Sequence, residues 1–336
     1  MVSLSAIQAS NANIASALPA GLVAVFVGAT SGIGETALKQ FARHTRQPRI
    51  YFVGRSDEAG KRVADECRSL NKDGQYNFVR ADVGLIRSVD DVCRDITAKE
   101  TAINLLFLTP GTMVSHTETA EKLHLATALV YHSRTRFIVN LLPLLQRATS
   151  LRRVVTVFAG GKEGNVDTND LQAWKVPMLS TRGHVSSMVT VSLETLAKQA
   201  PEVSFVHAFP GAVKTNLSRG AKSLSIVVLR AVFKVIGPLI YIPNEEVGER
   251  QLFLATSARY PPSAGGAEGV PLAGAVAVAR GTDGKAGSGV YSVDQEGETS
   301  DAKVELLTKL RKEGVPEKVW NHTEEEFKRI TGVEAV

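Results

Sequence analysis

The feature that most constrains the fold is an alternation of short apolar runs with longer amphipathic stretches. The apolar runs are rich in β-branched residues and nearly continuous, which is typical of strands buried on both faces of a parallel sheet. Strands that alternate with helices in this way predict a doubly wound α/β sheet. The predicted strands are Leu22–Val27, Arg49–Val53, Tyr76–Val79, Ile103–Leu108, Arg153–Phe158 and Val203–Ala208.

The stretches between these runs repeat apolar residues at helical spacing. They predict helices over Ile33–His44, Asp57–Leu70, Ile86–Lys99, Glu118–Arg147 and about Thr181–Gln199. After Ala208 the rhythm changes, and a glycine-rich excursion separates further short elements. There the patterns predict helices at Glu245–Thr256, Asp301–Leu310 and Glu324–Ile330, some strand in Ala275–Ala279 and a last short strand at Gly289–Val293.

A glycine-rich string lies between the first predicted strand and the first predicted helix. It reads Val27-Gly28-Ala29-Thr30-Ser31-Gly32-Ile33-Gly34. Gly28 permits a tight turn, Gly32 lets the backbone approach a pyrophosphate, and Gly34 allows the helix to pack closely on the strand. The free N–H groups of the helix would then face the phosphates, whereas the alternative is a flexible loop. The predicted cofactor contacts are Gly28, Thr30, Ser31, Gly32, Ile33 and Gly34.

The residue after the second predicted strand bears on which dinucleotide binds. Proteins selective for NAD usually have an acidic residue near this position, where it binds the ribose 2′-hydroxyl. This chain has Arg55, and a guanidinium can clamp a 2′-phosphate, so NADP(H) is the predicted cofactor. The alternative is an ordinary solvated arginine. Asp82 and Val83 follow the third strand, where a carboxylate can accept a hydrogen bond from the adenine amino group.

The composition argues against several other classes of protein. The 336 residues include 39 Lys and Arg against 34 Asp and Glu, and no run of like charge is long enough to favour nucleic-acid binding. Cys67 and Cys93 lack the spacing of metal ligands, so neither a disulfide scaffold nor a metal site is predicted. Such sparse cysteine usage fits a reducing, cytoplasmic location.

With these motifs in place, the chain resembles the short-chain dehydrogenase/reductase family over about residues 22–257. A late string, Pro210-Gly211-Ala212-Val213-Lys214-Thr215, resembles the segment that follows strand six in that family. The resemblance implies that Pro210, Gly211 and Thr215 contact the nicotinamide carboxamide and the phosphates. The whole chain is similar to a subgroup common in filamentous fungi and often associated with natural-product pathways.

The composition of the two ends, together with the resemblance, predicts how the chain is organised. We expect a flexible N-terminal arm over residues 1–20 and a Rossmann domain that binds NADP(H) over residues 21–260. A C-terminal extension over residues 261–336 would pack on the same domain. In the family, the long fourth and fifth helices build a homodimer interface, so a homodimer is expected. The family also has a mobile lid over the substrate, which here would span about residues 217–243.

The family's proton-transfer residues are missing from the positions where the resemblance implies them. The family uses a Ser, a Tyr and a Lys, usually with an Asn, to move a proton and orient the substrate. Here Ala159 stands at the Ser position, Arg182 at the Tyr position, Ser186 at the Lys position and Val130 near the Asn position. A shift of the alignment does not restore the motif, because no Tyr or Lys lies between Lys175 and Lys198.

Three other side chains are candidates for the vacant role. His184 titrates near neutrality and can donate a proton. Lys162 or Arg182 can stabilise a developing oxyanion without transferring a proton. Each also has an ordinary reading, since Lys162 and Glu163 can be a solvated loop pair, and Arg182 and His184 can cap a helix or contact the cofactor.

The apolar segment 217–242 has three readings. As a lid it would form an apolar pocket wall, which favours a small apolar substrate. With Arg230 and Lys234 on its other face it could rest on a membrane surface, and it could also be ordinary core.

Three functions remain open. The first is an NADPH-dependent oxidoreductase that acts on an apolar carbonyl, enone or imine of a natural-product pathway. The second is a non-redox cyclase or isomerase, and the third is a catalytically silent partner that binds NADP(H). Fold alone does not choose among them.

Overall fold

The sheet predicted from the apolar runs is present and parallel throughout. The computed structural model describes residues 2–114, 116–215, 217, 237, 240–266 and 269–336. Its strands follow the order β3-β2-β1-β4-β5-β6-β7. β1 and β4 are buried at every residue, as the continuous apolar runs require. The strands are β1 Val23–Val27, β2 Arg49–Gly54, β3 Gln75–Arg80, β4 Leu105–Leu108, β5 Arg153–Val157, β6 Ser204–Ala208 and β7 Val290–Val293.

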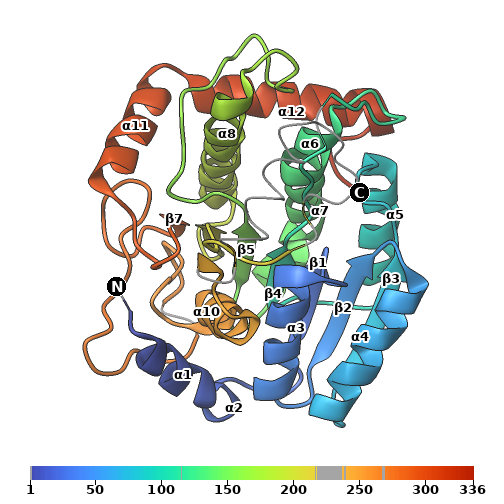
Figure 1. Ribbon diagram of the computed structural model, residues 1–336, viewed down its shortest axis with the longest axis vertical. Coiled ribbons are helices and arrows are strands. Elements are labelled where there is room, and N and C mark those ends of the chain that lie inside the picture. Colours follow the sequence, from blue (N-terminus) through green and yellow to red (C-terminus); the bar gives the residue numbers. More distant parts are fainter. Residues whose placement is uncertain (1, 115, 216, 218–236, 238–239, 267–268) are drawn as a thin grey trace.

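Helices cover both faces of the sheet, so the doubly wound prediction is confirmed (Figure 1). One face packs against α3 (Gly32–His44), α4 (Asp57–Leu70) and α10 (Asn244–Thr256). The other packs against α5 (Ile86–Thr97), α7 (Ser133–Arg147) and α8 (Met178–Gln199). The chain leaves β1 toward β2 and later returns to place β4 on the other side of β1. In open α/β sheets, ligands bind beyond the carboxyl ends of the strands at such a reversal.

The expected flexible arm over residues 1–20 is instead helical and packed against the domain. It contains α1 (Leu4–Ala12) and α2 (Ile14–Ala17). Their inner face carries Ile7, Asn11, Ile14 and Leu18, which are all buried and recur at helical spacing. Asn11 donates hydrogen bonds to the backbone oxygen and to Oε2 of Glu249 on α10. The prediction was wrong because the small polar residues between these four positions mask the apolar stripe.

The C-terminal extension ends in two helices, α11 (Asp301–Lys312) and α12 (Val315–Thr331). α12 lies across α8 and also contacts α5 (Figure 1). The hydroxyl of Tyr131, just before α7, is hydrogen-bonded to Ser192 of α8 and to Thr323 of α12. Every residue from 130 to 138 is buried. α12 therefore packs on α8, one of the two helices assigned to the expected dimer interface, and the homodimer stays a prediction.

Two further expectations concern the region between β6 and β7. Residues 275–279 form no strand, although the sequence pattern predicted some strand there. Most of the predicted lid over 217–243, and with it the predicted membrane contact, lies outside the described residues. No helix in the part of the chain that the structure describes is both long and apolar enough to cross a membrane.

Candidate functional site

The glycine loop, residues 28–34, is folded tightly against the segment that follows β4. Gly28 has a φ of 79°, in the left-handed region that strains other residues. A Cβ at Gly28 would lie 2.9 Å from Thr109 Oγ1. A Cβ at Gly34 would lie 2.6 Å from the same oxygen and 2.8 Å from the carbonyl oxygen of Gly28. Both positions therefore need glycine for steric reasons.

The start of α3 is open to an anionic ligand. Ser31 is the N-cap residue, but its side chain makes no capping hydrogen bond. The N–H groups of the first helical turn are therefore left for another partner, and phosphate oxygens suit them. Gly32 has a φ of 60°, and a Cβ added to it would lie 3.4 Å from Thr215 Cγ2. This geometry fits the pyrophosphate of a dinucleotide.

The late string lies beside the glycine loop, as the approach of Thr215 to Gly32 shows. Its Gly211 also has a φ of 79°, and an added Cβ would lie 2.8 Å from Ile242 Cδ1. Pro210 and Gly211 lie one residue beyond β6, after Phe209, and are half-buried. The structure thus brings together two strings that are far apart in the sequence.

Arg55 lies at the end of β2, next to the glycine loop. Thr30 packs against Gly54, where an added Cβ would be 2.8 Å from Thr30 Oγ1. Arg55 is exposed and has no hydrogen bond or ion pair with any described residue. Arg62, by contrast, is paired with both carboxylate oxygens of Glu35 and also donates to Thr30 O. Arg55 is therefore the available cation at this edge of the loop.

Asp82 and Val83 follow β3 in a turn. Asp82 is exposed, and its Oδ1 accepts a hydrogen bond of 3.1 Å from the backbone N–H of Gly84. Val83 is 8% exposed. The turn holds the Asp82 carboxylate at the same edge of the sheet as Arg55.

The three predicted catalytic candidates contact different neighbours. Lys162 is half-buried, and its Nζ lies 5.3 Å from the ring centre of Phe209, directly before the late string. Arg182 is exposed in the second turn of α8. His184 is buried, and its Nδ1 accepts a hydrogen bond from the backbone N–H of Asp167. Burial lowers the pKa of His184, so the ring is neutral and positions a loop.

Two of the four positions compared with the family's catalytic residues, Ala159 and Ser186, lie close together. Ser186 Oγ donates a hydrogen bond of 2.6 Å to the carbonyl oxygen of Ala159. Ala159 follows β5 and Ser186 is on α8, so this hydrogen bond joins the two positions at which the resemblance implies a Ser and a Lys. α8 itself contains no tyrosine. Within the described residues, no three His, Cys, Asp or Glu side chains gather where they could hold a metal ion.

Glu163 is a buried acid that the sequence analysis treated as solvated. Its side chain lies between α8 and the sheet and is 3% exposed as a residue. Burial raises the pKa of Glu163, although Ser292 and Thr190 hydroxyls bond to its Oε1. Its other carboxyl oxygen, Oε2, has no partner among the residues that the structure places. The solvated-pair reading is therefore wrong for this residue.

A backbone hydrogen bond fixes the tautomer of His207, a histidine linked to Glu163 through Thr190. Ala159 N–H donates to His207 Nε2 at 3.2 Å. Burial lowers the pKa of His207 to about 3, so the neutral ring carries its proton on Nδ1. That N–H then donates to Thr190 Oγ1 at 2.9 Å, and the Thr190 hydroxyl donates to Glu163 Oε1 at 2.8 Å. A directed chain of hydrogen bonds thus links the family's Ser position to a buried carboxyl group.

Arg134 is a second buried group that sequence reasoning missed. It lies two residues after the π-helical segment η1 (Ala128–His132), the kind of helix irregularity that is frequent at functional sites. Its guanidinium donates to Thr156 Oγ1 at 2.6 Å and to Val157 O at 3.0 Å, at the end of β5. It also donates to Pro110 O at 2.5 Å, beyond the end of β4. The residue type of Arg134 does not draw attention to it. Only a comparison of the places where helices are irregular could have done so.

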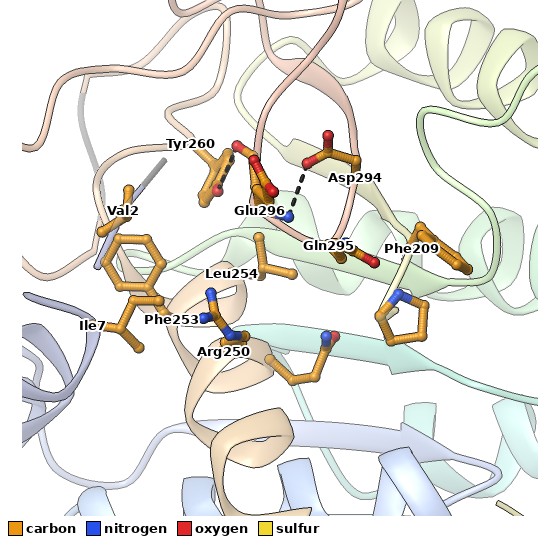
Figure 2. Close-up of a pocket in the computed structure, with 13 residues that line it drawn as sticks. Val2, Ile7, Phe209, Arg250, Phe253, Leu254, Tyr260, Asp294, Gln295 and Glu296 are labelled. Carbon is orange, nitrogen blue, oxygen red and sulfur yellow. Dashed lines mark hydrogen bonds between the residues drawn. The ribbon is translucent and has the colours of Figure 1, made fainter. Parts of the chain in front are cut away.

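A small pocket opens between α1, α10 and the turn after β7 (Figure 2). Its lining includes Phe209 and Pro210, which it shares with the late string, but no residue of the glycine loop. Ile7 of α1 and Leu254 of α10 contribute apolar walls. The pocket therefore borders the predicted cofactor site without being that site.

Several known proteins are similar to this chain over most of its length. The family model described as short chain dehydrogenase matches residues 22–164. The Oxidoreductase AN1596 of Emericella nidulans is 39% identical over 330 residues, covering 96% of this chain and 97% of the relative. The Short-chain dehydrogenase/reductase SAT2 of Stachybotrys chartarum is 30% identical, with 96% of each chain covered.

A solved structure shares the fold at low sequence identity. The Pseudomonas aeruginosa RhlG/NADP active-site complex superposes with a TM-score of 0.54 at 18% identity, covering 78% of this chain and 98% of that one. The family match and the full-length relatives identify the chain as an enzyme. It belongs to the short-chain dehydrogenase/reductase family of oxidoreductases.

Proposed function

We propose that the protein is an NADP(H)-dependent oxidoreductase that acts on an apolar carbonyl, enone or imine in a secondary-metabolite pathway. The observation that carries the choice of cofactor is Arg55, exposed and unpaired with any described residue beside the glycine loop. A 2′-phosphate would complete a charge-assisted pair there. The fungal relatives that match nearly the whole chain support the pathway assignment.

Different residues of the site would bind different parts of NADP(H). The glycine loop and the uncapped start of α3 would hold the pyrophosphate, and Arg55 the 2′-phosphate. Asp82 would accept from the adenine, and Thr215 would close over Gly32. When bound, the cofactor supplies a hydride to the substrate.

The proton that completes the reduction has a non-standard source in this proposal, or comes from solvent. α8 offers no tyrosine, and Ala159 has no hydroxyl where the family has one. A substrate that is already strongly electrophilic needs little acid assistance once it is positioned. Lys162 and the exposed Arg182 remain the candidates for electrostatic help, whereas the buried His184 already bonds a loop.

The Arg55→Ala variant tests the cofactor assignment. Loss of a charge-assisted pair with the 2′-phosphate should weaken NADPH binding about 10- to 100-fold, since such bonds contribute about 1.5–3 kcal/mol. NADH lacks this phosphate, so its affinity should change by less than about twofold. Titration of the cofactor fluorescence measures both affinities. Arg68→Ala, on the exposed side of α4, is the matched control and should leave both unchanged. Equal weakening of NADPH and NADH by the Arg55 change would refute the assignment.

Deletion of the gene in the source organism separates redox chemistry from the alternatives. An oxidoreductase should leave an intermediate that differs from the normal product by two hydrogen atoms. A cyclase or isomerase would leave an intermediate with the same elemental composition as its product. Mass spectrometry of culture extracts reads out the difference. An unchanged metabolite profile would favour the silent partner instead.

A further inference from the structure

Arg134 is a buried cation whose hydrogen-bond partners among the described residues are all neutral oxygens. It is 3% exposed, and it bonds one hydroxyl and two backbone carbonyl oxygens. Its Nε is buried and has no hydrogen-bond partner in the described structure. The guanidinium has five N–H donors, so it retains capacity for at least one further acceptor.

Two other buried arginines, Arg136 and Arg259, are neutralised by carboxylates. Arg136 pairs with Asp90, and Arg259 pairs with Glu298. No described carboxylate pairs with Arg134, and burial lowers its pKa to about 9. A buried charge without a counter-ion costs several kcal/mol, so its retention points to a partner that arrives with a ligand.

The position of Arg134 places that partner at the carboxyl edge of the sheet. Its Nη2 donates a hydrogen bond to the carbonyl oxygen of Pro110. Gly28 packs against the same residue, because a Cβ added to Gly28 would lie 3.0 Å from the backbone nitrogen of Pro110. Arg134 and the glycine loop thus both contact the segment Thr109–Pro110. A Cβ added to Gly111, the next residue, would lie 4.0 Å from Arg134 Nη2.

We propose that Arg134 forms an anion subsite in the substrate cleft, where its guanidinium binds a carboxylate, enolate or phenolate oxygen of the substrate. The proposal rests on the proposed function and adds an anionic oxygen to the apolar substrate class. The cofactor's phosphates are the other possible source of such an oxygen. In the proposed function these phosphates bind the loop between β1 and α3, whereas the hydrogen bonds of Arg134 go to the end of β5 and to Pro110, beyond the end of β4. The substrate is therefore the favoured source.

Calorimetric titration of the full-length protein with benzoate tests the subsite, with and without NADP⁺. Benzamide, which has the same shape and no charge, is the control ligand. The wild type should bind benzoate at least about tenfold more tightly than benzamide. Arg134→Gln should lose at least about tenfold in benzoate affinity and change NADPH affinity by less than about twofold. Arg134→Lys, which keeps the charge, should recover part of the loss, and Arg68→Gln should behave as wild type.

Several results would overturn the proposal. The first is that the wild type binds benzoate and benzamide equally well, and the second is that Arg134→Gln leaves the benzoate affinity unchanged. The third is that Arg134→Gln weakens only NADPH binding, which would assign the charge to a phosphate. A wild type that binds benzoate at Arg134 but not NADPH would refute the proposed function alone. If the Gln variant does not fold, crystals of the wild type soaked with 4-bromobenzoate decide. Anomalous scattering must place the carboxylate within hydrogen-bond distance of Arg134, and any other position refutes the subsite.

Discussion

Gly28→Ala is expected to abolish NADPH binding and to lower the free energy of unfolding by about 2–4 kcal/mol. The new Cβ would impose two costs at once. It would strain a backbone with a φ of 79°, and it would lie 2.9 Å from Thr109 Oγ1. Thr109 cannot easily retreat, because its hydroxyl donates to the carbonyl oxygens of Val27 and Gly28. The loop must therefore move, and the N–H groups that face the pyrophosphate move with it.

Gly21→Ala is the matched control for this collision. Gly21 lies before β1 as Gly28 lies after it, and both have a φ of 79°. No atom lies within 4 Å of the place where a Cβ would be at Gly21. This variant should lose only the strain, about 1–2 kcal/mol, and bind NADPH as the wild type does. Urea unfolding and cofactor fluorescence measure both quantities. If the two variants lose NADPH affinity equally, steric closure of the loop is not what shapes the cofactor site.

Sequence predicted the sheet and the glycine loop because both depend on residues that are neighbours in the chain. A strand's continuous apolar run reports burial on both faces, and the glycine spacing reports a turn of fixed geometry. The arm over residues 1–20 failed for a different reason. Its stripe of Ile7, Asn11, Ile14 and Leu18 is sparse, and the polar Asn11 is buried only because Glu249 accepts its hydrogen bonds.

The polar groups beneath the site could not be predicted in the same way. Glu163 lies in a loop pattern that favours solvent, yet Thr190 and Ser292 enclose it from elements far along the chain. His184 was a plausible acid by residue type, but its burial and its bond to the backbone of Asp167 decide its role. Charge state in this protein depends on packing between elements, which residue type and spacing do not encode.

The buried ion pair of Asp90 and Arg136 should respond most strongly to a single substitution. The side chains of both residues are at most 2% exposed, and two hydrogen bonds of 2.6 and 2.7 Å join them. Asp90→Asn removes the carboxylate charge and leaves the buried guanidinium of Arg136 without this counter-ion. Such a loss costs about 3–5 kcal/mol, a large share of the roughly 5–15 kcal/mol that stabilise a typical domain.

The same arginine holds the C-terminus, so the damage should extend to α12. Arg136 donates to the backbone oxygens of Val333 and Glu334 and lies 5.0 Å from the ring centre of Phe327. Asp90→Asn should therefore speed proteolytic removal of the C-terminal residues as well as lower the urea midpoint. Asp91→Asn is the adjacent control, since Asp91 is 73% exposed and pairs with Arg94 at the surface. Such surface pairs contribute little, so its unfolding should match the wild type. If both variants behave alike, the tail is held by apolar packing of α12 and not by this charge pair.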